Sequence, residues 1–158
     1  MNSTMVRALI CFGALLVLGS VNYSIFGKEQ IRQHGDVIYL ALAPIDPRSL
    51  MQGDYMALRF QLADAIEAAQ GKGKVHRGTA GVRLDDRHIA TLNQDSSAAL
   101  QLRYRIRGGK VWLGTNAYFF EERTASRYAN ARYGEFRLDR DSGEAVLVGL
   151  RDENLKAL

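Results

Sequence analysis

Cysteine and histidine are scarce in this sequence, with one cysteine and three histidines among 158 residues. Since Cys11 has no second cysteine to pair with, no disulfide can form within the chain and no thiolate cluster can hold a metal ion. His34, His76 and His88 lack the i, i+3 or i+4 spacing that places two zinc ligands on one helix face. We therefore expect neither a metal site nor a cofactor.

Basic runs and the common catalytic motifs are missing as well. Lys and Arg total 21 against 17 Asp and Glu, a net charge of +4, and both signs are interspersed. A nucleic-acid-binding domain usually gathers its basic residues in one patch or run. The sequence also has no glycine-rich phosphate loop, no nucleotide-binding fingerprint and no Ser-His-Asp set. These absences favour a protein that is not an enzyme and does not bind nucleic acid.

One long stretch without charge lies near the N-terminus. Residues 8–27 are 20 uncharged, largely apolar residues between Arg7 and Lys28, and about 20 such residues span a hydrocarbon core as a helix. Counted only to Val21, the run is 14 residues, nearer to the core of a cleaved signal peptide. Residues 17–20, however, match the small-residue cleavage pattern poorly. We therefore expect an uncleaved signal anchor over residues 1–27.

Arg7 and the amino group predict the orientation of this anchor. Positive charge beside a first membrane helix is retained in the cytoplasm, so residues 28–158 are expected to cross the membrane as an extracytoplasmic domain. In a bacterial chain this means a single-pass protein of the inner membrane with its C-terminal domain in the periplasm. The membrane is thus the first expected partner, and the oligomeric state is left open.

Strands and hairpins dominate the expected secondary structure after residue 35. Apolar residues on both faces predict a central strand at 36–43, strict alternation predicts a strand at 55–63, and composition predicts a short helix at 63–71. Turn residues separate three pairs of further strands, at 77–84 and 88–93, at 99–107 and 110–115, and at 135–140 and 144–150.

The segment 121–132 shows helical periodicity, with Ala125, Tyr128, Ala129 and Arg132 on one face. We therefore expect an amphipathic helix there. The predicted fold class is α+β, a β-rich antiparallel sheet or barrel-like domain with one or two helices, preceded by an N-terminal transmembrane helix.

The stretch DPRSLMQGDYMALRF, residues 46–60, has the composition of a turn that leads into a strand. Asp46 and Pro47 suit the first two positions of a type I turn. Asp54 heads a strand face that is otherwise apolar, and a buried carboxylate is costly without a partner. The guanidinium of Arg48 is the obvious partner. We expect an Arg48–Asp54 latch that stabilises the fold, with a ligand site at these residues as the alternative.

Residues 53–60, GDYMALRF, resemble the motif that names the GDYXXLXY family of bacterial proteins. Phe60 stands where the last tyrosine of that motif is expected, which keeps a ring and removes a hydroxyl. The matching residues are Gly53, Asp54, Tyr55 and Leu58. The resemblance covers most of residues 25–150. It implies a membrane-anchored protein, similar to those often encoded beside a larger multi-span membrane protein of unknown function, so such a protein is the expected partner.

Three arginines alternate along the predicted strand 99–107. Arg103, Arg105 and Arg107 should point to one side of that strand. A solvated sheet face is the simple interpretation, and a docking surface for anionic lipid headgroups or an acidic partner is the functional one. Trp112, beyond the Gly-Gly turn, could stack on one of these cations. We thus expect a membrane-anchored accessory or interaction domain.

Two other functions stay open. Ser49, followed by Leu50, Met51 and the GDY sequence, loosely resembles elements of membrane signal peptidases, whose serine is activated by a lysine. Lys74 and Lys110 are the candidate bases of such a Ser/Lys hydrolase, although no supporting motif surrounds them. The second alternative is a sensor that holds a small anion between Arg48 and the three arginines.

Overall fold

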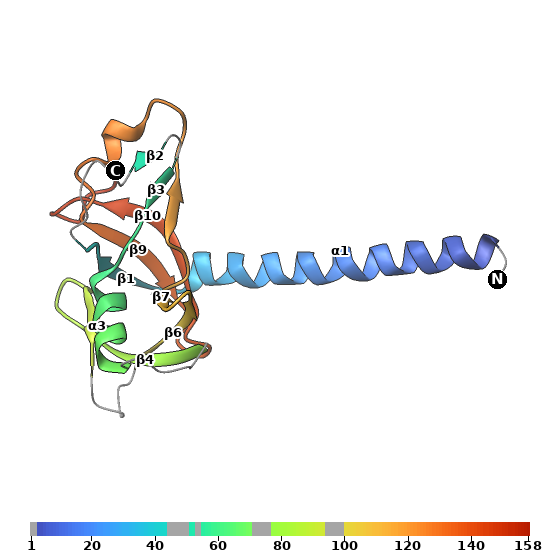
Figure 1. The fold of residues 1–158 in the computed structure, drawn as a ribbon, viewed down its shortest axis with the longest axis horizontal. Coiled ribbons are helices and arrows are strands. Elements are labelled where there is room, and N and C mark those ends of the chain that lie inside the picture. Colours follow the sequence, from blue (N-terminus) through green and yellow to red (C-terminus); the bar gives the residue numbers. More distant parts are fainter. Residues whose placement is uncertain (1–2, 44–50, 53–54, 71–76, 94–99) are drawn as a thin grey trace.

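The computed structural model describes residues 3–43, 51–52, 55–70, 77–93 and 100–158. A long helix, α1 (Ser3–His34), projects from a β-rich body at its C-terminal end (Figure 1). The large apolar side chains of α1 are exposed, and the helix is long and apolar enough to cross a membrane. It continues past residue 27, where we expected the anchor to end. The division into domains at that residue stays a prediction.

The body contains three small antiparallel sheets, which curl into a half-barrel. The sheet of order β1-β9-β10 consists of β1 (Asp36–Ala41), β9 (Tyr133–Leu138) and β10 (Ala145–Arg151). The sheet of order β2-β3-β8 consists of β2 (Met51–Gln52), β3 (Tyr55–Ala57) and β8 (Ala117–Phe119). The sheet of order β5-β4-β6-β7 consists of β5 (Ala90–Leu92), β4 (Arg77–Leu84), β6 (Leu100–Arg107) and β7 (Lys110–Trp112).

The sheets share one apolar core. Ile38 and Leu40 of β1, Leu102 of β6 and Phe136 of β9 are fully buried. Helix α3 (Gln61–Gln70) buries Ile66 and packs against β1, β5 and β7, and a short 3-10 helix, η1 (Ala125–Tyr128), follows β8. Because successive side chains of a strand alternate between its faces, β6 keeps one face for the core and one for solvent.

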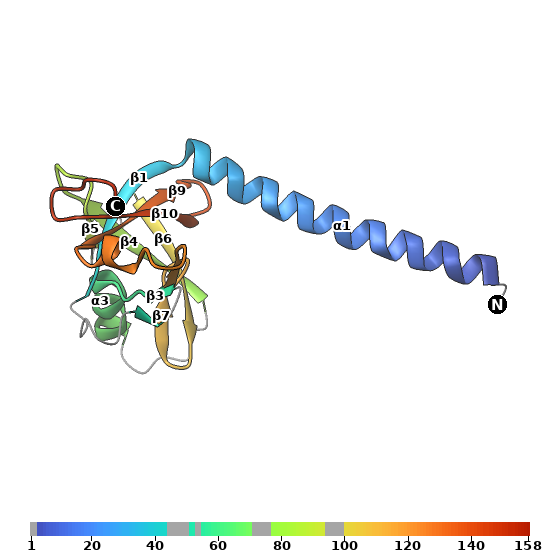
Figure 2. The same cartoon turned by 90° about the horizontal axis from the view of Figure 1, so that it is seen from above.

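α1 joins the body without a linker (Figure 2). Gly35 alone separates α1 from β1. Its N–H donates to the Ile31 carbonyl at 2.8 Å, and the Gly35 carbonyl accepts a hydrogen bond from the Arg137 guanidinium at 3.3 Å. An ion pair also joins Lys28 of α1 to Glu144 of the β9–β10 turn. These contacts fix the direction in which α1 leaves the sheet.

Much of the predicted secondary structure is confirmed, including the fold class, the short helix and the three hairpins. At the turn between β6 and β7, Gly108 and Gly109 have φ of 57° and 76°, a region that glycine occupies without steric penalty. The strand at 36–43 forms as β1, but it is not central. It pairs with β9 along one edge, and otherwise residues 36–43 make isolated bridges, from Tyr39 to Ile89 and from Leu42 to Phe60.

The strand predicted at 55–63 is wrong in its second half. β3 ends at Ala57, and α3 begins at Gln61, where the Phe60 carbonyl accepts the N–H groups of Ala63 and Asp64. The alternating residues Leu58, Phe60 and Leu62 are all buried, as expected. Their spacing thus identified the buried positions, but these continue from a strand end into the first turn of a helix.

The amphipathic helix predicted over 121–132 is also wrong. Only the single 3-10 turn of η1 forms there, and Arg123 just before it has φ of 67°, which a right-handed helix excludes. Tyr128 is buried against Tyr118 and Phe120. The packing of Tyr128 on the rings at and just after β8 thus outweighs the helical periodicity of the sequence.

Candidate functional site

Most of the motif residues chosen from the sequence lie outside the described residues. These are Asp46, Pro47, Arg48, Gly53 and Asp54, so the Arg48–Asp54 latch stays a prediction. The anion sensor invoked Arg48, and the hydrolase invoked Ser49 and Lys74, which also lie outside them. The part of the motif that can be placed consists of Tyr55, Leu58 and Phe60.

Two of these three residues build the core, and the third reaches the surface. Leu58 and Phe60 are buried, and the Phe60 ring meets Phe136 edge-on with ring centroids 5.3 Å apart. The ring that the family motif has at this position is therefore packed, without its hydroxyl. Tyr55 is half-buried on β3, and its ring lies 5.8 Å from that of Phe119 on the neighbouring strand β8.

An aromatic ledge, formed by Tyr55, Tyr118, Phe119, Phe120 and Tyr128, lies along β8 and η1. Phe119 leaves 76% of its surface exposed, more than any other large apolar side chain of the described body residues. Tyr128 stacks on Phe120 at 5.2 Å and meets Tyr118 at 5.3 Å. Burial and a hydrogen bond with Tyr128 raise the pKa of Tyr118 above its ordinary value. The ledge thus has two parts, the exposed Phe119 ring beside Tyr55 and the packed rings of Tyr118, Phe120 and Tyr128, and the side chains of Tyr118 and Phe119 lie on opposite faces of β8.

The second exposed feature is a cationic face on β4 and β6. Arg103, Arg105 and Arg107 are exposed at alternate positions of β6, which confirms their expected common direction. Arg77 of β4 lies directly opposite Arg105 in the antiparallel register and is also exposed. Since directly opposed residues lie on the same face of a sheet, Arg77 adds a fourth guanidinium to this face.

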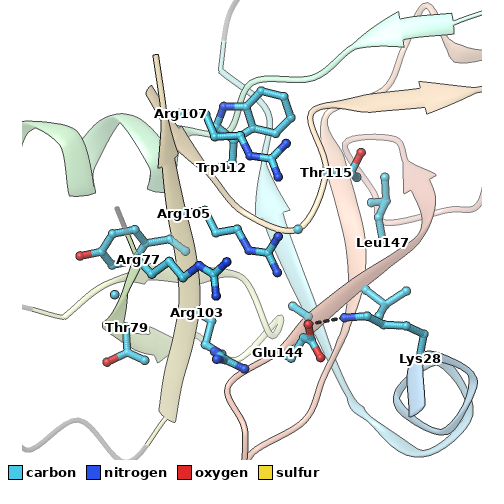
Figure 3. Close-up of a pocket in the computed structure, with 15 residues that line it drawn as sticks. Lys28, Arg77, Thr79, Arg103, Arg105, Arg107, Trp112, Thr115, Glu144 and Leu147 are labelled. Carbon is cyan, nitrogen blue, oxygen red and sulfur yellow. Dashed lines mark ion pairs between the residues drawn. The ribbon is translucent and has the colours of Figure 1, made fainter. Parts of the chain in front are cut away.

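These four arginines line one side of a hollow of about 730 Å³, which we call the cationic groove (Figure 3). Its other side is formed by residues 144–147 and by Lys28 of α1. Figure 3 shows Arg77, Arg103 and Arg105 pointing toward the side where Lys28 and Glu144 form their ion pair. The groove therefore lies between the four-stranded sheet, the start of β10 and the end of α1.

Positive charge predominates in the cationic groove, which five basic side chains and one carboxylate line. Its only lining carboxylate among the described residues, that of Glu144, is paired with Lys28. Within the described chain, no carboxylate pairs with the guanidinium groups of the four arginines. Arg107 instead lies over the Trp112 ring, 5.3 Å from Cζ to the ring centroid, which confirms the expected cation stacking.

This arrangement can bind an anion. A guanidinium presents a planar fork of N–H donors that matches the oxygens of a carboxylate or a phosphate, and several side by side attract such groups strongly. Among the described residues there is no group of three His, Cys, Asp or Glu side chains that could hold a metal ion.

Sequence reasoning found the arginines of β6 but missed Arg77, Lys28 and Glu144. Arg77 joins them because β4 pairs with β6 as well as with β5, and local turn signals reveal only the second pairing. Lys28 and Glu144 meet because the β9–β10 turn lies against the end of α1. The one local signal for Arg77 in the sequence was a basic residue at the start of a strand whose side chains alternate in polarity.

Comparisons with curated proteins and with solved structures gave no significant match. A protein family, described as GDYXXLXY protein, does match, over residues 17–150. The matched range begins within α1, contains Tyr55, Leu58 and Phe60, and ends in β10, so it includes both the aromatic ledge and most of the cationic groove. Because this range is most of the sequence, the chain belongs to the GDYXXLXY protein family.

Proposed function

We propose that this chain is a membrane-anchored accessory protein, which docks on an integral membrane protein and does not catalyse a reaction. Its α1 is long and apolar enough to cross a membrane, and the body follows after one residue. Arg7, before the apolar segment, favours a cytoplasmic N-terminus, with the anchor in a bacterial inner membrane and the body in the periplasm. The body then stands close enough to the membrane to meet the extracytoplasmic loops of a multi-span protein.

Exposure of Phe119 is the observation that carries the docking proposal. Aromatic side chains are enriched among the residues that dominate binding at protein interfaces, above all where they are held by their neighbours. Phe119 is 76% exposed, and it is supported by the ring of Tyr55 from the family motif. Beside it lies a hollow of about 430 Å³, lined by Phe119, Phe120 and Tyr128 of the ledge and by Glu121, Thr124 and Arg127. Such a surface suits a partner that offers an apolar side chain with polar groups around it.

Affinity capture of the full chain from detergent-solubilised membranes tests this proposal. The wild-type chain should recover a multi-span protein. Phe119→Ala should bind it at least about tenfold more weakly, because truncating a central aromatic anchor commonly costs 2 kcal/mol or more. Its fold should persist, since a surface substitution changes stability by only about 0.5 kcal/mol.

Arg83→Ala is the control for this capture, because Arg83 is an exposed residue of β4 that does not belong to the ledge. It should recover the same protein in the same amount as the wild type. Recovery of the chain by itself, or equal recovery by Phe119→Ala, would contradict the proposed docking.

A further inference from the structure

The cationic groove lies at the depth of the lipid headgroups if α1 spans a membrane. The uncharged residues 8–27 rise about 30 Å as a helix, which equals the thickness of the hydrocarbon core. Lys28, the next residue, then lies at the boundary between hydrocarbon and headgroups, and it lines the groove. The remaining residues of α1, 29–34, rise only about 9 Å, so the body begins within or just above the headgroup layer.

A second hollow also places part of the cationic groove at the depth of the lipid headgroups. It has a volume of about 900 Å³ and lies along α1 from Tyr23 to His34. Arg105 lines it together with Arg140 and with the carboxylates of Asp36, Asp139, Asp141 and Glu144. Tyr23 belongs to the end of the uncharged segment, and tyrosine is enriched where a membrane helix leaves the hydrocarbon core. Arg105 also lines the cationic groove. A guanidinium of the groove therefore shares a cavity with the end of the membrane-spanning segment.

The junction between α1 and the body holds the groove at this depth. Gly35 and Arg137 attach the end of α1 to the sheet, and Lys28 pairs with Glu144 on the side of the groove that faces the arginines. In Figure 1 the body is spread across the axis of α1; the end of the helix packs against β9 and β10, and Arg105 of β6 lines a hollow along it. The arginines of β6 are thus carried beside the membrane surface and not on the far side of the body.

Charge and position together select one class of ligand. Arg77, Arg103 and Arg105 have no carboxylate partner in the described chain, and their N–H donors match phosphate oxygens. Anionic phospholipids present phosphate at this depth, and basic residues beside a membrane helix are attracted to them. A free phosphate ion has the same chemistry but has no reason to concentrate beside α1.

We propose that the cationic groove binds the phosphate headgroup of anionic phospholipids in the membrane that α1 spans. Arg77, Arg103 and Arg105 donate to the phosphate oxygens, while Arg107 stays stacked on Trp112. This inference deepens the proposed function and rests on its membrane anchor. The bound lipid fixes the body against the surface and leaves the aromatic ledge to the protein partner.

Trp112 supplies the test, because it lines the groove and is the only tryptophan of the chain. The full chain is reconstituted into phosphatidylcholine vesicles that contain increasing fractions of phosphatidylglycerol, and the fluorescence of Trp112 is recorded. We expect a saturable change with phosphatidylglycerol. Phosphatidylcholine vesicles to which inorganic phosphate is added should leave the emission unchanged.

Arg105→Gln and Arg83→Gln form a matched pair of variants, since both remove one exposed guanidinium from the same sheet and only Arg105 lines the groove. Arg105→Gln should raise the phosphatidylglycerol fraction at half-saturation about fivefold, the loss expected for one basic residue at a membrane surface. The double variant Arg103→Gln/Arg105→Gln should raise it more than tenfold. Arg83→Gln should behave as the wild type.

Each other outcome overturns the inference in a recognisable way. An equal response to inorganic phosphate would make the groove a site for the free ion. If Arg83→Gln weakened the response to phosphatidylglycerol as much as Arg105→Gln, the response would reflect the general surface charge of the body and not a site in the groove. If the chain sediments with the vesicles but its Trp112 fluorescence does not respond to phosphatidylglycerol, the headgroup site is excluded while the proposed membrane anchor is retained. A chain that fails to sediment with them would remove the anchor of the proposed function as well.

Discussion

Among single residues, Gly78 determines how closely β4 and β6 pack beneath the groove. It lies directly opposite Tyr104 in the register of these strands, and a Cβ atom built on it would lie 2.5 Å from Tyr104 Cζ and closer still to the hydroxyl. Tyr104 is only 5% exposed, so its ring has little room to move away. Tyr104 also stands between Arg103 and Arg105 on β6. The missing side chain at Gly78 thus makes room for the Tyr104 ring between β4 and β6.

Gly78→Ala should therefore lower the free energy of unfolding by about 1–3 kcal/mol, the usual cost of adding a methyl group to a packed site. Urea denaturation of the full chain in a neutral detergent measures this change. Gly149→Ala is the control, because a Cβ atom on Gly149 meets no atom within 4 Å. Equal stability of the two variants would show that Tyr104 yields easily and that Gly78 does not set the spacing of these strands.

Phe60 and Tyr55 show how far the sequence predicts the role of a motif residue. The alternation around Phe60 predicted a packed ring, and the ring is 3% exposed against Phe136. Burial of this kind follows from local pattern. The surface role of Tyr55 depends on its contact with Phe119, more than 60 residues away, because β3 pairs with β8. Local pattern contains no information about that pairing.

At the scale of elements, the β9–β10 turn connects the groove to α1. The Gly143 carbonyl accepts the N–H of Arg103 at 2.7 Å, and Glu144 forms the ion pair with Lys28. Asp139 closes the turn, since Ser142 Oγ donates to its carboxylate at 2.6 Å. This hydrogen bond from Ser142, helped by backbone N–H groups, lowers the pKa of Asp139.

Ser142→Ala should raise the pKa of Asp139 toward the ordinary value of about 3.9 for a free aspartate. Because the folded-state pKa is the lower one, this hydrogen bond stabilises the turn above the unfolded-state pKa, and the stabilisation is lost as pH falls through the folded-state pKa. The advantage of the wild type over the variant should therefore disappear on acidification below about pH 4. NMR titration of the Asp139 carboxyl carbon in the full chain measures the pKa.

Ser126→Ala provides the comparison, since Ser126 is an exposed serine of η1. It should leave the titration of Asp139 unchanged. The Gly143 amide, which donates to the Asp139 carbonyl at 2.8 Å, should exchange faster in Ser142→Ala than in Ser126→Ala at neutral pH. Identical titrations in the two variants would mean that another group lowers the pKa of Asp139.

Elements defined by turn chemistry were predicted better than elements defined by periodicity. The hairpins follow from residues such as Gly108 and Gly109, whose positive φ is a local requirement. The helix predicted over 121–132 required that its apolar face be buried by the body. Instead Tyr128 packs on the ring of Phe120, a contact that periodicity alone does not contain. The latch of Arg48 and Asp54 lies outside the described residues and stays a prediction.

For the whole molecule, the decisive quantity is the height of the body above the membrane. The groove can reach headgroups only because its distance from the uncharged segment is short. Inserting seven residues between Gly27 and Lys28 would raise the body by about 10 Å, since each helical residue adds about 1.5 Å. Seven residues make almost two turns, so the body would be rotated by only about 20° about the helix axis. Lys28 would keep its pairing with Glu144.

A heptad of Ala, Gln, Glu and Lys suits this insertion, because these residues favour helix and its charged side chains keep the new segment out of the hydrocarbon. The chain with the insertion should still sediment with vesicles, but its Trp112 response to phosphatidylglycerol should fall at least severalfold, because about 10 Å is one Debye length at 0.1 M salt. The same heptad placed after Leu158 leaves the height unchanged and should leave the response intact. An undiminished response in the raised chain would mean that the arginines reach the lipid by some route other than the fixed height of α1, and the rigid junction at Gly35 would lose its role.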